Sequence, residues 1–504
     1  MDLNTHYILN PNYLVFNDIN RCYLTTVHEF RYNYTVDFFQ NSCQFIHPLQ
    51  AQMLSFFDGQ ENLRTTLNKI ANHFGLSEEE VCTLITPYLE NQEDFAIKTG
   101  EHWIGFPKQM LVKKQNMERH RYYTPDDFPF SGTVEMKQKR LNIPRYYLFV
   151  LNTDCYTDCQ YCYADKKYKY TNKLSADRVI ELIDEIQSLG GAVNIDINGG
   201  ELPLHTENLK VIQHIVSLKY DPLVSTKMPL NPKQVERIAD TGLKRIQVSL
   251  DSPNSDVISR LLKVKQADYY QRMLDMLAEF DRHEITILIH PVLTRLNSNI
   301  PDIEKLLNDI LIFPHLKIIH FTPAGYSLFK GDDAYEKLKP SIDALNEIKA
   351  FIQPYAKQHP DRSIFVGDHR FIKSNFEDSI KKQALFETRT YCSGNQKSMI
   401  VMPDGKTTVC EEMYWHPRFI LGDLSRQSIL EAWNSDKAWE LYNLSQADFS
   451  DKSACKTCSQ FQTCRGVGKD ICWKHVQYFY GRENWDFPEP SCPYAPAAYH
   501  NCMI

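Results

Sequence analysis

The segment that most constrains this chain carries three cysteines directly after a strongly apolar stretch. Residues 146–151 read Tyr-Tyr-Leu-Phe-Val-Leu, which predicts a buried strand, and Cys155, Cys159 and Cys162 follow at the spacing C-x3-C-x2-C. A loop that leaves a strand can turn three thiolates toward one metal centre. Three thiolates suit a [4Fe–4S] cluster with one iron open to a further ligand. The alternatives are a zinc site or three unrelated cysteines.

Strand-like and helix-like stretches alternate from residue 145 onward. The clearest helical patterns cover residues 174–189 and 269–280, and the strand-like stretches are residues 146–152, 193–198, 223–226, 245–250, 285–293 and 317–321. Six repeats of this kind predict an α/β fold with a parallel sheet, either an open partial barrel or a doubly wound sheet. In both arrangements the binding groups lie at the carboxyl ends of the strands.

Polar motifs follow the second, third and fourth of these strands. They are Asn198-Gly-Gly-Glu201, Ser225-Thr-Lys227 and Ser249-Leu-Asp-Ser252. Two glycines allow a backbone to approach a ligand closely, and Glu201 could accept a hydrogen bond from an ammonium group. Each motif alone is weak, and Ser-x-Asp is as typical of a helix N-cap. Their order after successive strands is what makes them informative.

Together these motifs resemble those of the radical S-adenosylmethionine (radical SAM) enzymes. The three-cysteine loop of that family has this spacing and usually carries an aromatic residue before the last cysteine, here Tyr161. The resemblance implies that S-adenosylmethionine chelates the open iron, and that one electron splits it into methionine and a 5′-deoxyadenosyl radical. It assigns the cofactor contacts to Tyr161, Gly199, Gly200, Glu201, Lys227, Ser249, Asp251 and Arg260. One departure is Leu202, where many members have proline.

A second cysteine pattern lies after residue 390, where eight of the 14 cysteines are found. It resembles the SPASM domain, which follows the radical barrel in enzymes that act on peptides and proteins. The resemblance implies three [4Fe–4S] clusters in all, the two auxiliary ones held by Cys392, Cys410 and Cys472, and by Cys455, Cys458, Cys464 and Cys492. Seven residues separate Cys464 from Cys472 where the family has three. The first auxiliary cluster could be open to substrate or completed by Cys502, and a pair of zinc sites is the alternative to both clusters.

An acidic pair follows Cys410. In the related sulfatase-maturing enzymes the position that matches Glu411 is an aspartate, which takes a proton from the substrate radical. The resemblance therefore makes Glu411 the candidate base, with Glu412 as the alternative. The non-catalytic interpretation is a solvated turn residue.

The first 100 residues account for the acidity of the chain. They contain 5 Lys and Arg against 12 Asp and Glu, and the whole chain has a net charge of −7. Strands are expected at residues 13–16, 21–26 and 32–39, and helices at residues 48–57, 62–74 and 77–90. This order predicts a winged-helix-like domain, but an acidic segment argues against nucleic-acid binding.

That N-terminal pattern also resembles the peptide-recognition domain of many enzymes that modify ribosomally made peptides. In that family the leader of a precursor peptide pairs with the edge of a sheet as an additional strand. An acidic face would suit a leader that contains Lys or Arg. The alternative is a capping domain with no ligand.

The expected organisation has four parts. Residues 1–100 form the winged-helix-like recognition domain, 101–143 a linker, 144–380 a partial (β/α)6 TIM-like barrel, and 381–504 the cysteine-rich iron–sulfur domain. No apolar stretch approaches the length of a membrane span, and the start of the chain lacks the pattern of a signal peptide. We therefore expect a cytoplasmic protein whose cysteines are metal ligands or thiols rather than disulfides.

These features predict an oxidoreductase that matures a ribosomally made peptide by installing a thioether or carbon–carbon crosslink. Its expected partners are a precursor peptide and an electron donor such as flavodoxin or ferredoxin, with no nucleic acid and no membrane. Net oxidation is favoured because auxiliary clusters can accept the second electron. The alternatives are a sulfatase-type maturase that forms formylglycine, a peptide epimerase, and a redox-sensing or scaffold protein with structural clusters.

Overall fold

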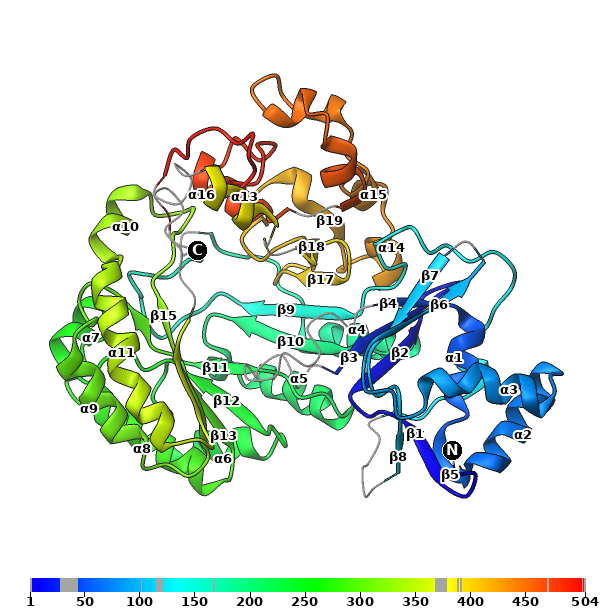
Figure 1. The fold of residues 1–504 in the computed structure, drawn as a ribbon. Coiled ribbons are helices and arrows are strands. Elements are labelled where there is room, and N and C mark those ends of the chain that lie inside the picture. Colours follow the sequence, from blue (N-terminus) through cyan, green and yellow to red (C-terminus); the bar gives the residue numbers. More distant parts are fainter. Residues whose placement is uncertain are drawn as a thin grey trace. The chain divides into compact units, whose positions relative to one another are not determined.

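The computed structural model describes residues 2–27, 44–100, 102–114, 121–165, 168–367, 379–387, 389, 392–468, 471–500 and 502 (Figure 1). The chain forms two compact units, Met1–Ile143 with Leu189–Val193, and Pro144–Ser188 with Asn194–Ile504. The strand expected at residues 32–39 lies outside the described residues. None of the described helices is long and apolar enough to cross a membrane.

Within its described residues, the N-terminal unit combines two small sheets, a hairpin and three helices. One sheet has the order β5-β1-β8 and the other β2-β3-β4, both antiparallel. The elements are β1 (His6–Leu9), β2 (Tyr13–Asn17), β3 (Cys22–Thr26), β4 (Gln44–Ile46), α1 (Pro48–Ser55), β5 (Asp58–Asn62), α2 (Leu63–Phe74), α3 (Glu78–Ile85), β6 (Phe95–Thr99), β7 (His102–Phe106) and β8 (Leu111–Lys113). Their apolar faces form one core.

The ends of these helices follow from local sequence. Ser77 and Glu80 form a capping box that begins α3. The helix was expected to reach residue 90 but ends at Ile85, because Pro87 cannot donate a main-chain hydrogen bond and the chain continues as a short 3₁₀ turn, Thr86–Tyr88. Helix α2 ends at Gly75, whose φ of 66° is the left-handed conformation that glycine adopts without strain.

The structure corrects the linker predicted at residues 101–143. Strand β7 pairs with β6, and β8 pairs with β1, so residues 102–113 belong to the N-terminal unit. Residues 135–142 are also fixed there, because the buried guanidinium of Arg21 donates to the carbonyl oxygens of Glu135 and Arg140 at 3.1 and 2.6 Å. Three- to five-residue strands show too little periodicity for the sequence to reveal them.

The second unit contains the predicted partial barrel. Its parallel strands are β9 (Tyr146–Asn152), β10 (Asn194–Gly199), β11 (Val224–Thr226), β12 (Arg245–Val248), β13 (Thr286–Ile289) and β15 (Leu316–Pro323). Figure 1 shows the connecting helices on the outer side of these strands: α4 (Ala176–Ser188), α5 (Thr206–Ser217), α6 (Pro232–Ala239), α7 (Ser255–Leu262), α8 (Tyr269–Arg282), α9 (Ile300–Ile310) and α11 (Ile342–Gln358). Strand β16 (Ser363–Val366) adds a further parallel strand beside β15.

The cysteine-rich part of this unit continues the barrel sheet. Strand β17 (Ser398–Val401) pairs in parallel with β9, and β18 (Lys406–Thr408) and β19 (Ile420–Asp423) follow in antiparallel order. Its helices are α13 (Ser379–Glu387), α14 (Ile429–Trp433), α15 (Asp436–Tyr442) and α16 (Trp473–Tyr480). Strand β9 therefore has a hydrogen-bonded neighbour on both edges, and these fix the start of the cysteine loop that follows it.

Candidate functional site

The cysteine loop lies at the carboxyl end of β9, over the mouth of the barrel. Cys155, Cys159 and Cys162 all line one cavity of about 690 Å³. The main-chain N–H groups of Asp158 and Gln160 donate to the carbonyls of Leu262 and Leu261 at 2.9 and 2.8 Å. Those carbonyls belong to the last turn of α7, where the helix has no N–H donors of its own to satisfy them. The C-terminal end of α7 therefore holds the cysteine loop in place.

The Gly-Gly-Glu motif meets the backbone of the same loop. A Cβ atom on Gly200 would lie 2.0 Å from the carbonyl oxygen of Asp154, and one on Gly199 would lie 2.8 Å from that of Asn152. The glycines were expected to let the backbone approach a ligand. The structure shows that they let strand β10 end against the cysteine loop, to which Glu201 donates a main-chain hydrogen bond at Asp154 (2.6 Å).

The Glu201 carboxylate points into the cavity from this junction. Its side chain is 2% exposed, and it accepts hydrogen bonds from the Thr226 hydroxyl and from the main-chain N–H of Lys227 at 3.1 Å. Burial raises the pKa of this carboxyl to about 7, although the hydrogen bonds and the charge of Lys227 act in the opposite direction. A carboxylate in this position can accept a proton or bind a cation near neutral pH.

A buried network joins three of the residues assigned to the cofactor. Lys227 Nζ lies 3.2 Å from Asp251 Oδ2, and the Tyr161 hydroxyl bonds to both. Burial alone would lower the pKa of Lys227, but the charge of Asp251 raises it, so the side chain is an ammonium. The other carboxylate oxygen of Asp251 accepts the main-chain N–H of Val292 at 2.9 Å. The network connects the cysteine loop to the ends of β11 and β12.

Not every predicted cofactor contact reaches the cavity. Ser249 lines it, as do Tyr161, Lys227 and the Gly-Gly-Glu motif. Arg260 instead lies exposed on α7, on the side opposite Leu261 and Ile258, which are buried. Among the described residues, neither Asp251 nor Arg260 lines the cavity: Asp251 is joined to it through Lys227 and Tyr161, whereas the assignment of Arg260 stays a prediction.

The first auxiliary set gathers beside the same cavity. Burial, followed by the charge of Cys472, raises the pKa of Cys392 to about 12. Against the effect of burial, Glu412, Cys410, Glu411 and Cys472 together raise the pKa of Lys474. Cys392 therefore lies near Cys472, and Lys474 lies near both Cys410 and Cys472. The thiol of Cys502 points elsewhere and donates to the carbonyl of Tyr478 at 3.2 Å.

The two candidate bases beside Cys410 have different surroundings. Both Glu411 and Glu412 line the cavity. Glu412 is 2% exposed, with one oxygen 3.2 Å from Lys474 Nζ and the other accepting the Tyr478 hydroxyl at 2.7 Å. Glu411 is half-buried and lies 3.5 Å from the Cys410 sulfur. Both oxygens of Glu412 are therefore occupied by structural partners, whereas Glu411 adjoins the ligand set.

The second auxiliary set lines a separate cavity of about 430 Å³. It contains Cys455, Cys458, Cys464 and Cys492. Burial, followed by the charges of the other three, raises the pKa of Cys492 to about 11. Four thiols around one position fit a [4Fe–4S] cluster, and the three thiols of the cysteine loop fit a cluster with one open iron. Four thiols also suit zinc, so the donor atoms alone do not separate the two metals.

The structure adds cavity residues that the sequence did not indicate. His290 follows β13, and Tyr326, Lys474, His475 and Tyr478 reach the cavity from later parts of the chain. Burial lowers the pKa of His290 to about 4, so its imidazole is neutral near pH 7. A polar residue directly after an apolar strand was the available signal for His290. The residues of α16 carried no comparable signal.

Comparison with known proteins agrees with this geometry. The profile of the Radical SAM superfamily matches residues 149–310, and that of the SPASM iron–sulfur cluster-binding domain matches residues 392–459. The mycofactocin maturase MftC of Mycobacterium tuberculosis is 22% identical over 368 residues, which cover 72% of this chain and 86% of MftC. MftC of Mycobacterium ulcerans is 23% identical over 362 residues, covering 71% of this chain and 90% of that protein.

A solved structure has a similar fold over nearly the whole chain. SuiB of Streptococcus suis aligns with a TM-score of 0.60 at 12% identity, covering 96% of this chain and 98% of SuiB. SuiB bound to the precursor peptide SuiA aligns with a TM-score of 0.58 at 13% identity, covering 95% and 98%. At such low identity the likeness shows a shared fold, and it extends over the N-terminal unit as well as the partial barrel.

Proposed function

Because this chain is a radical SAM enzyme with a SPASM domain, we propose that it matures a ribosomally made precursor peptide by forming an oxidative crosslink, a thioether or a carbon–carbon bond. The observation that carries the proposal is a single cavity of about 690 Å³ lined both by the cysteine loop and by Glu411, Glu412 and Lys474 beside the auxiliary ligands. A substrate side chain in this cavity lies between the two metal sites. MftC is named a maturase, and SuiB has been captured with its precursor peptide, which supports a peptide substrate.

The residues have two roles: most would bind cofactors, and one would accept the proton that the substrate loses. Three [4Fe–4S] clusters and S-adenosylmethionine, when bound, would supply two things. One is a 5′-deoxyadenosyl radical, which takes a hydrogen atom from the substrate, and the other is an acceptor for the electron left on the substrate. The three cysteine sets would hold the clusters, Glu201 would accept a hydrogen bond from the ammonium group of the cofactor, and the Lys227–Asp251–Tyr161 network would fix the loop beside it. Glu411 accepts the substrate proton. Per crosslink the peptide loses one hydrogen atom, one proton and one electron, which together equal two hydrogen atoms.

Recognition of the leader belongs to the N-terminal unit in this proposal. Its small antiparallel sheets provide strands to which an extended peptide could be added. The exposed first turn of α3 carries Glu78, Glu79 and Glu80, and residues 1–100 are acidic overall, so a leader with Lys or Arg would be favoured. A low-potential donor such as flavodoxin or ferredoxin supplies the electron. Thiolates that hold iron–sulfur clusters, rather than disulfides, suit a reducing cytoplasm.

Co-expression with candidate precursor peptides, followed by mass spectrometry, tests this function. We expect a loss of two hydrogen atoms per event and fragments that stay joined after proteolysis. Unchanged mass with inverted stereochemistry would indicate an epimerase instead. A product that reacts with hydrazide reagents would indicate formylglycine. Removal of Met1–Ile143, the N-terminal unit without its short second segment, should abolish peptide binding under the proposal.

Glu201 should make the affinity for S-adenosylmethionine depend on pH. The pKa of its carboxyl is about 7, and only the ionised form attracts the ammonium group of the cofactor. Affinity should therefore be highest above about pH 8 and should fall as the pH decreases through 7, approaching about tenfold per unit. Calorimetric titration of the reconstituted protein across this range measures the slope. Glu201→Gln should bind weakly with no such slope, and a persistent slope in that variant would contradict the assignment.

A further inference from the structure

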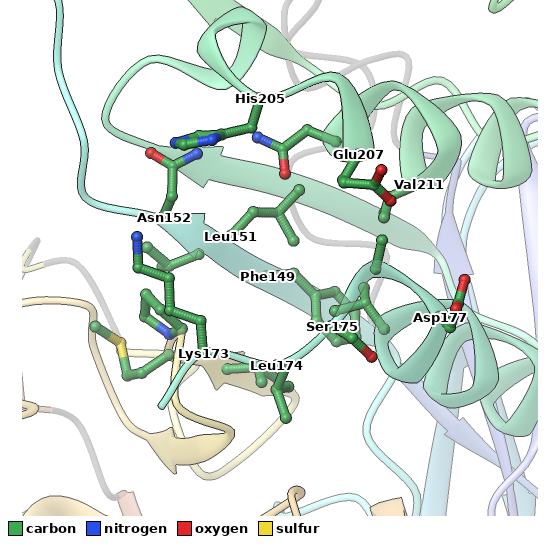
Figure 2. A pocket seen from close by; sticks show the side chains of 17 residues that line it. Phe149, Leu151, Asn152, Lys173, Leu174, Ser175, Asp177, His205, Glu207 and Val211 are labelled. Carbon is green, nitrogen blue, oxygen red and sulfur yellow. The ribbon is translucent and has the colours of Figure 1, made fainter. Parts of the chain in front are cut away.

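A second pocket lies on the outer side of strand β9, away from the cavity that holds the cysteine loop. It has a volume of about 290 Å³ and is enclosed by β9, the start of α4, the start of α5 and the turn after β17. Figure 2 shows its apolar floor, formed by Phe149 and Leu151, with polar side chains at the two ends. Asn152, Lys173 and His205 lie at one end, and Ser175, Asp177 and Glu207 lie toward the other.

The first end carries a buried donor that is not satisfied. Asn152 is 2% exposed, and its Oδ1 accepts the main-chain N–H of Asp154 at 3.0 Å, which sets the orientation of the amide. Within the described part of the chain, Asn152 Nδ2 has no hydrogen-bond partner. Figure 2 shows this nitrogen on the side of the amide that faces the pocket. An unpaired buried donor is costly, so a carbonyl or carboxylate oxygen placed here would relieve it.

The charges at this first end are already balanced. Lys173 Nζ and His205 Nε2 lie 2.8 and 2.9 Å from the same oxygen of Asp154. A ligand therefore meets one free neutral donor there rather than an uncompensated cation. A neutral main-chain carbonyl suits that donor better than a carboxylate.

The second end has an excess of negative charge. Asp177 and Glu207 both line the pocket, and the nearby ammonium is that of Lys210, 2.9 Å from Glu207. Two carboxylates against one ammonium leave one net negative charge. Glu207 and Lys210 are 62% and 59% exposed, so this end is open to solvent and accessible to a second cation.

We propose that this pocket binds a lysine or arginine residue of a peptide, with its main-chain carbonyl on Asn152 and its cationic side chain beside Asp177 and Glu207. The aliphatic part of such a side chain would cover Phe149 and Leu151, as long basic side chains cover apolar surfaces elsewhere. The same chemistry could be offered by a free amino acid. A residue within a peptide fits the pocket better than a free amino acid. The α-ammonium and α-carboxylate of a free amino acid would both lie beside the single neutral amide of Asn152. Assigning the residue to the precursor peptide rests on the proposed function.

Occupation of this pocket would act directly on the cofactor site. The Asn152 carbonyl accepts the N–H of Gly200 at 3.0 Å, and the Asp154 carbonyl accepts that of Glu201. Asp154 precedes Cys155, and its side chain is held by Lys173 and His205, which line the pocket. A bound residue would therefore contact the segment that joins β9 to the cysteine loop. Peptide binding outside the cavity could in this way order the loop before the reaction.

The test measures binding rather than product formation. The probe is Nα-acetyl-lysine N-methylamide, titrated into the reconstituted holoenzyme saturated with S-adenosylmethionine so that the reaction cavity is occupied. We expect it to bind at least about fivefold more tightly than the norleucine analogue, which lacks the ammonium, and more tightly than free lysine. The double variant Asp177→Asn/Glu207→Gln should lose the preference for lysine and retain 5′-deoxyadenosine formation. Glu181→Gln, an exposed acid on α4 outside the pocket lining, is the matched control and should change neither.

A second variant probes the other end of the pocket. Asn152→Asp keeps an acceptor for the Asp154 N–H and replaces the donor, so both the lysine and norleucine probes should weaken by about tenfold. Equal binding of the two probes to the native protein, absence of binding, or a preference retained in the double variant would overturn the site. Equal binding of free lysine would overturn the peptide as its source. Each readout is independent of crosslink formation, so failure of the proposed function would appear separately, as an unmodified peptide in co-expression.

Discussion

Gly200→Ala should abolish S-adenosylmethionine cleavage while leaving the rest of the protein folded. The added Cβ would lie 2.0 Å from the carbonyl oxygen of Asp154 and 2.5 Å from its carbonyl carbon. These are backbone atoms directly before Cys155, and they cannot move aside as the end of a flexible side chain could. Either the end of β10 or the cysteine loop must shift by about an ångström. A displacement of that size in a reacting centre costs about 10²-fold or more in rate.

The measurement separates loss of the radical site from loss of the fold. After anaerobic reconstitution, the variant should lack the signal of the radical cluster, retain the auxiliary clusters, and release at least about 10²-fold less 5′-deoxyadenosine. Gly325→Ala is the matched control, because Gly325 lines the same cavity and a Cβ there meets no atom within 4 Å. Gly199→Ala, with its closest contact at 2.8 Å, should be intermediate. Full turnover by Gly200→Ala would mean that the loop is not held as the structure shows.

From the sequence, the cysteines and the Gly-Gly-Glu motif could be identified as site residues. The structural reason for the two glycines could not be predicted. Cys155, Cys159 and Cys162 lie within eight residues of the chain. Their spacing alone can therefore reveal that their side chains come together. The partner of Gly200 is the backbone of Asp154, far away in sequence, and a local pattern carries no record of it. The sequence therefore indicated a ligand near the glycines, which line the cavity, but not their close contact with the loop.

The difference between local patterns and contacts that are distant in the sequence also explains what the sequence did not reveal. Arg260 was the weaker candidate for the cofactor carboxylate, and the helical period that buries Ile258, Leu261 and Leu262 directs it to solvent. That period could have been read from the sequence. By contrast, the pairing of β17 with β9 joins residues about 250 positions apart in register, and no periodicity in either strand specifies it. The Tyr161–Asp251 hydrogen bond spans 90 positions and was equally hidden.

Removing the charge of Asp251 should strongly destabilise the barrel. Lys227 and Asp251 have side-chain exposures of 13% and 1%, so in Asp251→Asn the ammonium of Lys227 would stay buried without its counter-charge. Loss of one partner from a buried pair costs about 3–5 kcal/mol. Asparagine keeps an acceptor for the Val292 N–H but places its amide NH2 beside Lys227 and Tyr161, so the effect combines the lost charge with the lost acceptor. We expect a lower unfolding temperature in anaerobic calorimetry and no detectable binding of S-adenosylmethionine.

A double variant distinguishes stability from function in this network. Lys227→Met/Asp251→Asn removes both charges, and replacing a buried pair by neutral groups is often close to neutral for stability. The double variant should recover most of the lost unfolding temperature but should still fail to bind or cleave S-adenosylmethionine, because the charged network beside the cysteine loop is gone. Glu181→Gln, which breaks an exposed pair with Arg178, should change the free energy of unfolding by less than about 0.5 kcal/mol. If the double variant regained cofactor binding along with stability, Lys227 and Asp251 would be structural residues, and the cofactor contacts would have to lie with Glu201 and Ser249 instead.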